Sequence, residues 1–373
     1  MNYFIKNIHI NKLFHLENLD IPIDNEKYPH LIITGKNGSG KTVLLNAIAD
    51  VVSNAKILED KFQWISYDGK SDLSVDFTNN NQQTSYIAVF YQASRITDML
   101  EPQNPTKPEY AKLGDIRHTA TSQFLYFLSD LKIQEALARN EKQFYDADKI
   151  TAWFADFEKL LQQIFQDKDL KLEFNYKDYS FKICTEGKKF KFTQMSDGFA
   201  AALDIVADLI LKMQDDDSLT RAYEKEGIVL IDEIETHLHL ELQKIIMPFL
   251  ATTFPNIQFI VTTHSPFVLS SMPNAVAYDL EHRKPIEDLS NYSYESLAEG
   301  YFRVSTESSS VEMRINRLKD LFEQKERSDS DKNEIRLLIT ELDKVSEAVS
   351  PDLVGEYISL KLNHINIIKE IGK

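Results

Sequence analysis

A glycine-rich loop lies between two apolar stretches early in the chain. Residues 31–33 are typical of a buried strand and residues 43–49 of a helix, so the order is strand, loop, helix, as in a phosphate-binding P-loop. The glycines let successive backbone N–H groups turn toward phosphate oxygens, and the helix N-terminus adds its positive dipole end. An accidental glycine-rich turn is the alternative. The loop residues that we expect to bind a nucleotide are Gly35, Asn37, Gly38, Ser39, Gly40, Lys41 and Thr42.

Four side chains are expected to act on the phosphates of ATP. Lys41 would reach the β- and γ-phosphates, and the Thr42 hydroxyl would bind Mg²⁺. Asp232 closes the apolar run 227–231, where it can hold Mg²⁺ through water opposite Thr42. The adjacent Glu233 can polarise the attacking water. Acidic pairs after strands also cap helices, and it is the P-loop upstream that favours the catalytic interpretation here.

Two more apolar runs end in polar side chains that suit the same site. His264 follows a run that ends at residue 262 and can reach the γ-phosphate, although a lone histidine is more often structural. Gln92 ends another run, where a residue that senses Mg²⁺ and water would lie. Ser94 and Arg95 are alternatives for that sensor.

The elements around these residues predict an α/β fold. Apolar and alternating patterns indicate strands at 3–10 and 19–23, both at a sheet edge, and at 73–77, 86–91, 227–231 and 257–262. Strands that alternate with helices around a P-loop form a mostly parallel sheet, so we predict a P-loop NTPase fold. A loop at 101–115 and helical periodicity from 119 to 165 predict a helical insert at about 101–165, and residues 170–192 predict a three-stranded meander.

The chain beyond the candidate site is predicted to be helical and charged. We expect one domain over residues 1–280 and a helical region over 281–373 for assembly or partner docking. Two amphipathic stripes support this expectation. They could instead pack on each other and on the first domain. The stripes consist of Val311, Ile315, Leu318 and Phe322, and of Ile335, Leu338, Ile339 and Leu342.

Composition narrows the class of protein. The chain has 373 residues, a net charge of −16 and one cysteine, Cys184, so it can form no internal disulfide. Nucleic-acid binders are usually basic, because phosphate neutralisation supplies much of their affinity. Lys188, Lys189 and Lys191 could form a local basic patch, but a solvated hairpin turn is the simpler interpretation. The chain lacks a signal-peptide pattern and any apolar run near the ~18 residues of a membrane span, so we expect a cytoplasmic protein without a membrane partner.

The motif order resembles that of the ABC-type ATPases of the SMC/RecF/OLD class. In this resemblance residues 35–42 are similar to Walker A, residues 228–233 to Walker B and residues 235–239 to the D-loop. Residues 195–199, MSDGF, resemble the ABC signature. Gln92 then corresponds to the Q-loop and His264 to the switch histidine. The resemblance implies an ABC-type ATPase head that uses ATP and Mg²⁺.

Residues 232–239, DEIETHLH, are similar to the DE-x-E-x-HLH signature of AAA-family ATPases common in bacterial anti-phage systems such as Septu, retrons and PARIS. This similarity implies an ATP-hydrolysing sensor or regulatory subunit that controls a separately encoded nuclease or toxin. The alternative is a RecF- or SMC-like repair ATPase that clamps DNA when ATP closes the dimer. A transporter motor is disfavoured, because Met195 and Phe199 stand where such signatures have Leu and Glu or Gln.

The signature also implies how the protein assembles. In this class, residues at the positions of Ser196 and Gly198 complete the nucleotide site of a facing protomer, so ATP is sandwiched between two subunits. We therefore expect a homodimer or a higher homo-oligomer. Residues 281–373 lack the carboxylate cluster of a TOPRIM nuclease and the Cys/His set of a zinc or HNH nuclease. The effector is therefore expected on another chain.

Overall fold

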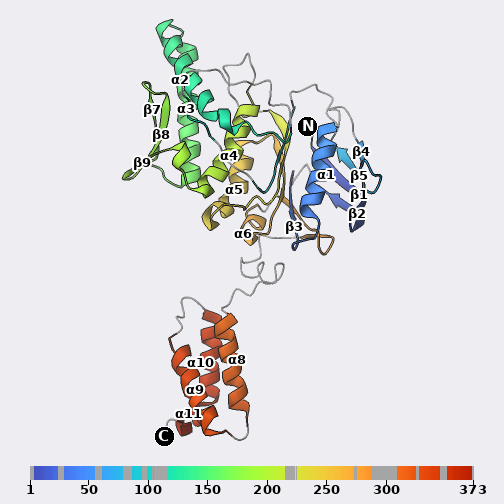
Figure 1. The fold of residues 1–373 in the computed structure, drawn as a ribbon, viewed down its shortest axis with the longest axis vertical. Helices are drawn as coiled ribbons and strands as arrows, with labels where there is room; N and C mark the ends of the chain where they lie inside the picture. The colour runs from blue at the N-terminus through green and yellow to red at the C-terminus, as the bar shows by residue number, and fades with distance from the viewer. Residues whose placement is uncertain are drawn as a thin grey trace. The chain divides into compact units, whose positions relative to one another are not determined.

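The chain divides into two compact units, Met1–Tyr292 and Ser293–Lys373, each with its own apolar core. Figure 1 shows sheets and helices in the first unit and a group of helices in the second. Among the helices within the described ranges, none is both long and apolar enough to cross a bilayer. The computed structural model describes residues 4–23, 29–54, 61–78, 86–94, 99–102, 104, 116–214, 223, 225–272, 275–286, 309–324, 327–344 and 351–371.

A six-stranded sheet forms the centre of the first unit, with the strand order β13-β12-β3-β11-β10-β6. Five strands run parallel, and β13 pairs antiparallel at one edge. Helices cover both faces (Figure 1), so β11 is buried along its whole length, as strands of parallel sheets usually are. The strands are β3 (His30–Thr34), β6 (Tyr86–Tyr91), β10 (Glu226–Ile231), β11 (Ile257–Thr262), β12 (Ala275–Asp279) and β13 (Lys284–Ile286).

The parallel order brings the polar residues that follow four strands to one edge of this sheet. The P-loop follows β3, Gln92 follows β6, Asp232 follows β10 and His264 follows β11. Because β10 lies between β6 and β11, Ile231 pairs with Tyr91 on one side and with Val261 on the other. Sites of open α/β sheets form at this edge, beyond the carboxyl ends of the strands.

A second, antiparallel sheet has the order β2-β1-β5-β4. Helix α1 (Lys41–Asn54) lies between the two sheets, and one apolar cluster joins Leu44 and Ile48 of α1 to Ile8 of the small sheet and Ile228 of the large one. The prediction that residues 3–10 and 19–23 lie at a sheet edge is right for β2 and wrong for β1, which is flanked by β2 and β5. The strands are β1 (Ile5–Leu13), β2 (Leu16–Pro22), β4 (Lys61–Ile65) and β5 (Asp72–Phe77).

The helical insert is an antiparallel helix pair followed by a three-stranded sheet with the order β7-β8-β9. Residues 103 and 105–115 of the predicted loop lie outside the described residues. Helix α4, which follows the insert, and α5 pack on the face of the large sheet opposite α1 (Figure 1). The elements are α2 (Phe124–Asn140), α3 (Phe144–Phe165), β7 (Lys171–Asn175), β8 (Ser180–Thr185), β9 (Lys188–Lys191), α4 (Asp197–Lys212), α5 (Leu240–Thr253) and α6 (Pro266–Leu269).

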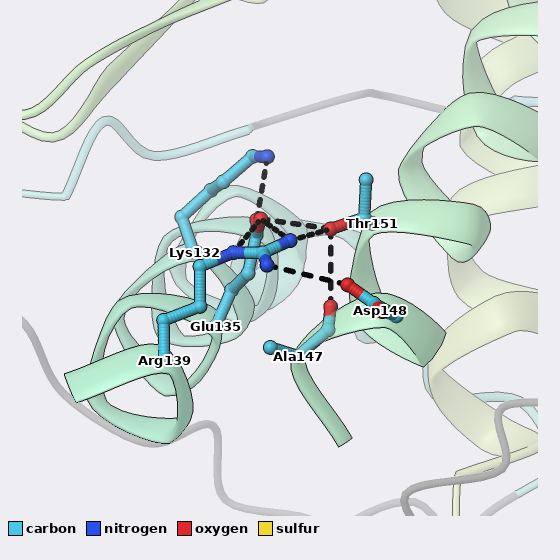
Figure 2. A network of polar contacts seen from close by, with 6 residues as sticks. All are labelled: Lys132, Glu135, Arg139, Ala147, Asp148 and Thr151. Carbon is cyan, nitrogen blue, oxygen red and sulfur yellow. Dashed lines mark hydrogen bonds and ion pairs between the residues drawn. The ribbon is translucent and has the colours of Figure 1, made fainter. Parts of the chain in front are cut away.

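Polar contacts tie α2 to α3 near the turn that joins them (Figure 2). Glu135 accepts hydrogen bonds from Lys132 Nζ at 2.9 Å and from Thr151 Oγ1 at 2.8 Å. Arg139 forms ion pairs with Glu135 and with Asp148 across the helix pair. Burial acts to raise the pKa of Glu135, but the bonds from Lys132 and Thr151 hold that pKa below its usual value. The charged form of Glu135 therefore stabilises the helix pair.

The second unit consists of helices whose two predicted stripes pack on each other. Ile315, Leu318 and Phe322 of α8 are buried in one cluster with Ile335 and Leu338 of α9. Residues of α10 and α11 complete this cluster, so the stripes do not form an open face for a partner within the described part of the unit. The helices are α8 (Ser309–Glu323), α9 (Asp329–Leu342), α10 (Pro351–Asn363) and α11 (Ile365–Ile371).

His30 makes the stability of the first unit depend on pH. The residue is 6% exposed, and its Nδ1 accepts the backbone N–H of Phe259 at 3.2 Å. Burial lowers the pKa of His30 from 6.5 to about 4. His30 of the unfolded chain therefore binds a proton below pH 6.5, whereas His30 of the folded chain binds one only below about pH 4. The contribution of neutral His30 to the free energy of unfolding is complete above pH 6.5 and is lost as the pH falls toward 4.

We expect the substitution His30→Asn to remove this dependence, because the amide oxygen can still accept a hydrogen bond but does not titrate. Between pH 7 and pH 5 the free energy of unfolding of the wild type should fall by about 2 kcal/mol more than that of the variant. Urea unfolding at the two pH values measures the difference. Equal losses in both proteins would contradict the prediction.

Candidate functional site

The P-loop is closed around the ammonium group of Lys41. The Lys41 Nζ donates hydrogen bonds to the carbonyl oxygens of Gly35 at 2.7 Å and of Lys36 at 3.2 Å. Gly40 has a φ of 99°, and a Cβ there would lie 3.2 Å from Leu16, so both the conformation and the space favour glycine. Burial lowers the pKa of Lys41, although nearby carboxylates act in the opposite direction. A buried cation with only carbonyl partners is well placed to receive an anion.

Ser39 gives a second indication that the loop fits a phosphate group. Its hydroxyl is buried and has no hydrogen-bond partner within the described part of the chain. A buried polar atom without a partner is unfavourable, and a phosphate oxygen would supply the missing bond. The residues present therefore fit a nucleotide phosphate.

A cavity of about 240 Å³ lies against this loop. Asn37, Gly38, Gly40, Lys41 and Thr42 line it from the P-loop side, together with Glu233 and His264 from the ends of β10 and β11. The fold thus brings together residues that are more than 190 positions apart in the sequence. Among the described residues, no group of three or more His, Cys, Asp or Glu side chains is arranged to hold a metal by itself.

Thr262, the last residue of β11, holds both members of the acidic pair. Its hydroxyl donates to Asp232 Oδ1 at 2.6 Å and accepts the backbone N–H of Glu233 at 2.8 Å. Asp232 is 3% exposed, whereas Glu233 lines the cavity. Glu233 has a φ of 44°, a left-handed conformation that a non-glycine residue adopts only when its surroundings enforce it. The hydrogen bond to Thr262 helps to hold Glu233 in this conformation. The sequence pattern did not indicate a role for Thr262.

Glu235 positions the loop that carries His264. Its carboxylate accepts the Thr263 hydroxyl at 2.8 Å and the backbone N–H of His264 at 2.5 Å. Burial raises the pKa of Glu235, and the bonds from His264 and Thr263 oppose that rise. Burial and the charge of Lys41 lower the pKa of His264, so its imidazole is neutral at pH 7. A neutral imidazole at the cavity wall can donate one N–H to a phosphate oxygen.

The turn between β1 and β2 adds residues that sequence reasoning missed. Phe14 is 72% exposed, has a φ of 54° and lines the cavity. His15 Nε2 lies 3.1 Å from the carbonyl oxygen of Ser39, and Arg283 donates to the carbonyl oxygen of His15 at 3.1 Å. An exposed aromatic ring beside a phosphate-binding loop offers a face for a nucleobase. The sequence holds no local signal for this turn, because only the pairing of β1 with β2 places it there.

The three residues proposed for Mg²⁺ lie in different surroundings. Thr42 lines the cavity. Asp232 is buried against Thr262 and does not line the cavity. Gln92 is exposed at the end of β6 and does not line the cavity either. Of the two alternatives to Gln92, Ser94 is also exposed, and Arg95 lies outside the described residues.

Ser196 and Gly198 lie away from this cavity in their own protomer. Ser196 is the N-cap residue of α4, and its side chain makes no capping hydrogen bond. A Cβ at Gly198 would lie 3.1 Å from both the carbonyl oxygen of His237 and the Nδ1 of His239, so glycine favours the close approach of α4 to that segment. Phe199 stacks on Phe165 at 4.3 Å between ring centroids. Ser196 lines a second cavity, and no residue lines both cavities.

The fold and the cavity define a P-loop nucleotide-binding protein. Residues 31–270 match the family model described as "AAA domain, putative AbiEii toxin, Type IV TA system". This match covers more than half of the chain, and the chain therefore belongs to that AAA family. The strand order and the family match together confirm the predicted α/β P-loop NTPase fold.

Relatives by sequence come from two anti-phage systems. The chain is 26% identical over 299 residues to "Septu protein PtuA" of Bacillus mycoides (strain KBAB4), an alignment that covers 72% of this chain and 39% of that protein. It is 48% identical over 77 residues to "Retron Ec83 probable ATPase" of Escherichia coli, which covers 20% of this chain and 14% of that protein. The chain thus spans well under half of the length of these two relatives. They confirm the resemblance to ATPases of anti-phage systems.

Among solved structures, the chain is similar to the SMC head bound to the C-winged helix domain of ScpA. The TM-score is 0.41 and the sequence identity is 13%, over 74% of this chain and 94% of that chain.

Proposed function

We propose that this protein binds ATP with Mg²⁺ and hydrolyses it as a regulatory subunit of an anti-phage defence system. The observation that supports this function best is that Lys41, Glu233 and His264 line one cavity. The chain also belongs to the AAA family. Curated relatives named as Septu and retron proteins support the defence role.

The geometry suggests how hydrolysis would proceed. Glu233 takes a proton from water as the water oxygen bonds to the γ-phosphorus. The bond from that phosphorus to the bridging oxygen breaks, and ADP leaves with its electron pair, so the products are ADP and phosphate. Lys41 and the neutral imidazole of His264 stabilise the charge on the γ-phosphate oxygens. Thr42 and Asp232 would hold Mg²⁺, which neutralises phosphate charge when bound. Gln92 would join them only after a movement of the segment that follows β6.

The signature residues support a sandwich of ATP between two protomers. Because Ser196 lines a separate cavity, its hydroxyl is positioned for a nucleotide other than the one in its own P-loop. We propose that ATP closes a homodimer, or a pair within a higher homo-oligomer, and that hydrolysis loosens it.

The effector, a nuclease or toxin, is proposed to be a separate protein that docks on residues 293–373 or on the helical insert. The stripes of α8 and α9 are buried, so docking on the second unit would use other apolar residues, such as the exposed Ile358 and Leu362 of α10.

DNA is the alternative partner. Of the three lysines on β9, Lys189 and Lys191 are paired with Glu173 and Glu101, which weakens the case for a DNA surface.

A phage plaque assay with the chain and its neighbouring gene tests this function. We expect the wild type to reduce plaque numbers and the variant Lys41→Ala to give none of that reduction. Lys189→Ala, a control outside the cavity, should protect fully.

A chain that ends at residue 292 tests where the effector docks. If it hydrolyses ATP but does not protect, docking is assigned to the second unit. Full protection by Lys41→Ala would overturn the proposal, and ATP-dependent DNA binding without protection would favour the repair alternative.

A further inference from the structure

Three lysines lie on β9, and one of them differs from the other two. Lys189 Nζ pairs with Glu173 at 2.7 Å, and Lys191 Nζ pairs with Glu101 at 3.1 Å. Lys188, at the start of β9, has no ion-pair partner among the residues that the structure describes. Its ammonium group is thus available to a ligand, whereas those of its neighbours are already neutralised.

Lys188 lines the same cavity as Ser196. The cavity measures about 350 Å³ and lies between the end of α3, the β8–β9 hairpin and the start of α4. Thr185, which pairs with Lys188 across the hairpin, also lines it. Asp167 is the acidic residue of the lining, and its Oδ1 accepts the backbone N–H of Asp169 at 2.9 Å. The cavity therefore holds a cation, two hydroxyl groups and aromatic walls, a set of groups that suits a phosphate.

This cavity is separate from the P-loop cavity of the same protomer. Phe199 is held between Phe165, at 4.3 Å between ring centroids, and His239, at 5.2 Å. Gly198 packs against the segment of His237 and His239, where a Cβ would lie 3.1 Å from atoms of both. Because no residue lines both cavities, the P-loop of another copy of the chain is the simplest source of a nucleotide that meets Ser196 and Lys188.

We propose that Lys188 binds the γ-phosphate of the ATP held by the P-loop of a second copy. The proposal rests on the proposed sandwich dimer and names a cation that closes it. Two copies with a net charge of −16 each repel one another, and bound ATP adds further negative charge. A lysine that reaches across the interface turns that local repulsion into attraction at the point of contact.

The first experiment compares Lys188→Ala with the matched control Lys189→Ala in the full chain. Monomeric Lys188→Ala should bind a fluorescent ATP analogue like the wild type, because Lys188 does not line its own P-loop cavity. Dimer formation with ATP and single-turnover hydrolysis should fall by roughly 10- to 100-fold, as expected for the loss of a charged hydrogen bond. Lys188→Arg should retain most of both. Lys189→Ala should behave like the wild type.

Mixing variants tests whether Lys188 acts on the partner's nucleotide. In a mixed dimer of Lys188→Ala and Lys41→Ala, one site combines an intact P-loop with an intact Lys188 from the facing copy. The mixture should therefore hydrolyse ATP faster than either variant alone. Replacing Lys41→Ala with the double variant Lys41→Ala/Lys188→Ala should abolish this rescue, because no intact Lys188 then remains.

Three results would overturn the inference. Equal hydrolysis by Lys188→Ala and Lys189→Ala would remove Lys188 from the site while leaving the sandwich intact. If monomeric Lys188→Ala bound ATP more weakly and mixing gave no rescue, Lys188 would act on the nucleotide of its own protomer. A wild-type chain that binds ATP but stays monomeric would reject the sandwich itself, and the inference with it.

Discussion

Replacing Lys41 with alanine should lower the affinity for ATP by at least about 100-fold, because it removes a buried cation that no other side chain of the cavity replaces. In the present structure the ammonium group of Lys41 donates only to carbonyl oxygens of the loop, and phosphate oxygens would be stronger acceptors. Isothermal titration of the full chain with ATP and Mg²⁺ measures the change. No heat of binding should be seen at ordinary protein concentrations.

Lys36→Ala is the matched control for this prediction. Lys36 belongs to the same loop, but its side chain pairs with Glu281 and does not line the cavity. The control should therefore bind ATP with nearly wild-type affinity. A thermal unfolding scan of both variants separates lost affinity from lost structure. Wild-type affinity in Lys41→Ala would reject the assignment of this loop as the nucleotide site.

The substitution Glu233→Gln is expected to leave ATP binding intact and to slow turnover by at least ~100-fold, in line with the loss of a positioned base. Glutamine keeps the shape of the side chain, and the backbone N–H at this position still reaches the Thr262 hydroxyl. Because hydrolysis no longer loosens the sandwich, the variant should accumulate as an ATP-closed dimer. Phosphate release measures the turnover, and size exclusion with and without ATP measures the dimer.

Glu241→Gln provides the same chemical change outside the cavity. Glu241 lies in the first turn of α5, exposed and paired with Lys244, so this variant should hydrolyse ATP at the wild-type rate. Normal turnover by Glu233→Gln would show that another group activates the water. Slow turnover without an ATP-dependent shift in size exclusion would count against the sandwich and would leave the role of Glu233 standing.

Some of the site is predictable from the sequence because it depends on local rules. A P-loop needs glycines at fixed positions between a strand and a helix, and residues 35–42 meet that need within one short segment. Asp232 directly follows one strongly apolar run, and His264 comes two residues after another. Because the carboxyl ends of parallel strands meet at one edge of the sheet, the order of these runs is enough to predict that the two residues lie close together.

Other parts depend on contacts that no local pattern encodes. Thr262 acts through hydrogen bonds to residues 29 or 30 positions away, so it has no recognisable spacing. Glu235 belongs to the DEIETHLH segment, but that pattern does not encode its bonds to Thr263 and His264, which are 28 and 29 positions away. Gln92 has the expected position at the end of its strand, yet only the fold shows that it does not line the cavity. The stripes of α8 and α9 are the same in sequence whether they bind a partner or each other, and the structure shows that they cover each other.

The P-loop, the acidic pair and the parallel sheet can be predicted from short segments, because backbone conformation and apolar periodicity are properties of such segments. Which side chains share a cavity depends on the tertiary structure. It placed Phe14 beside the P-loop, held Glu233 in a left-handed conformation and separated Ser196 from its own nucleotide site. Those outcomes depend on strand pairing and on how closely helices can pack, which are relations between segments far apart in the chain.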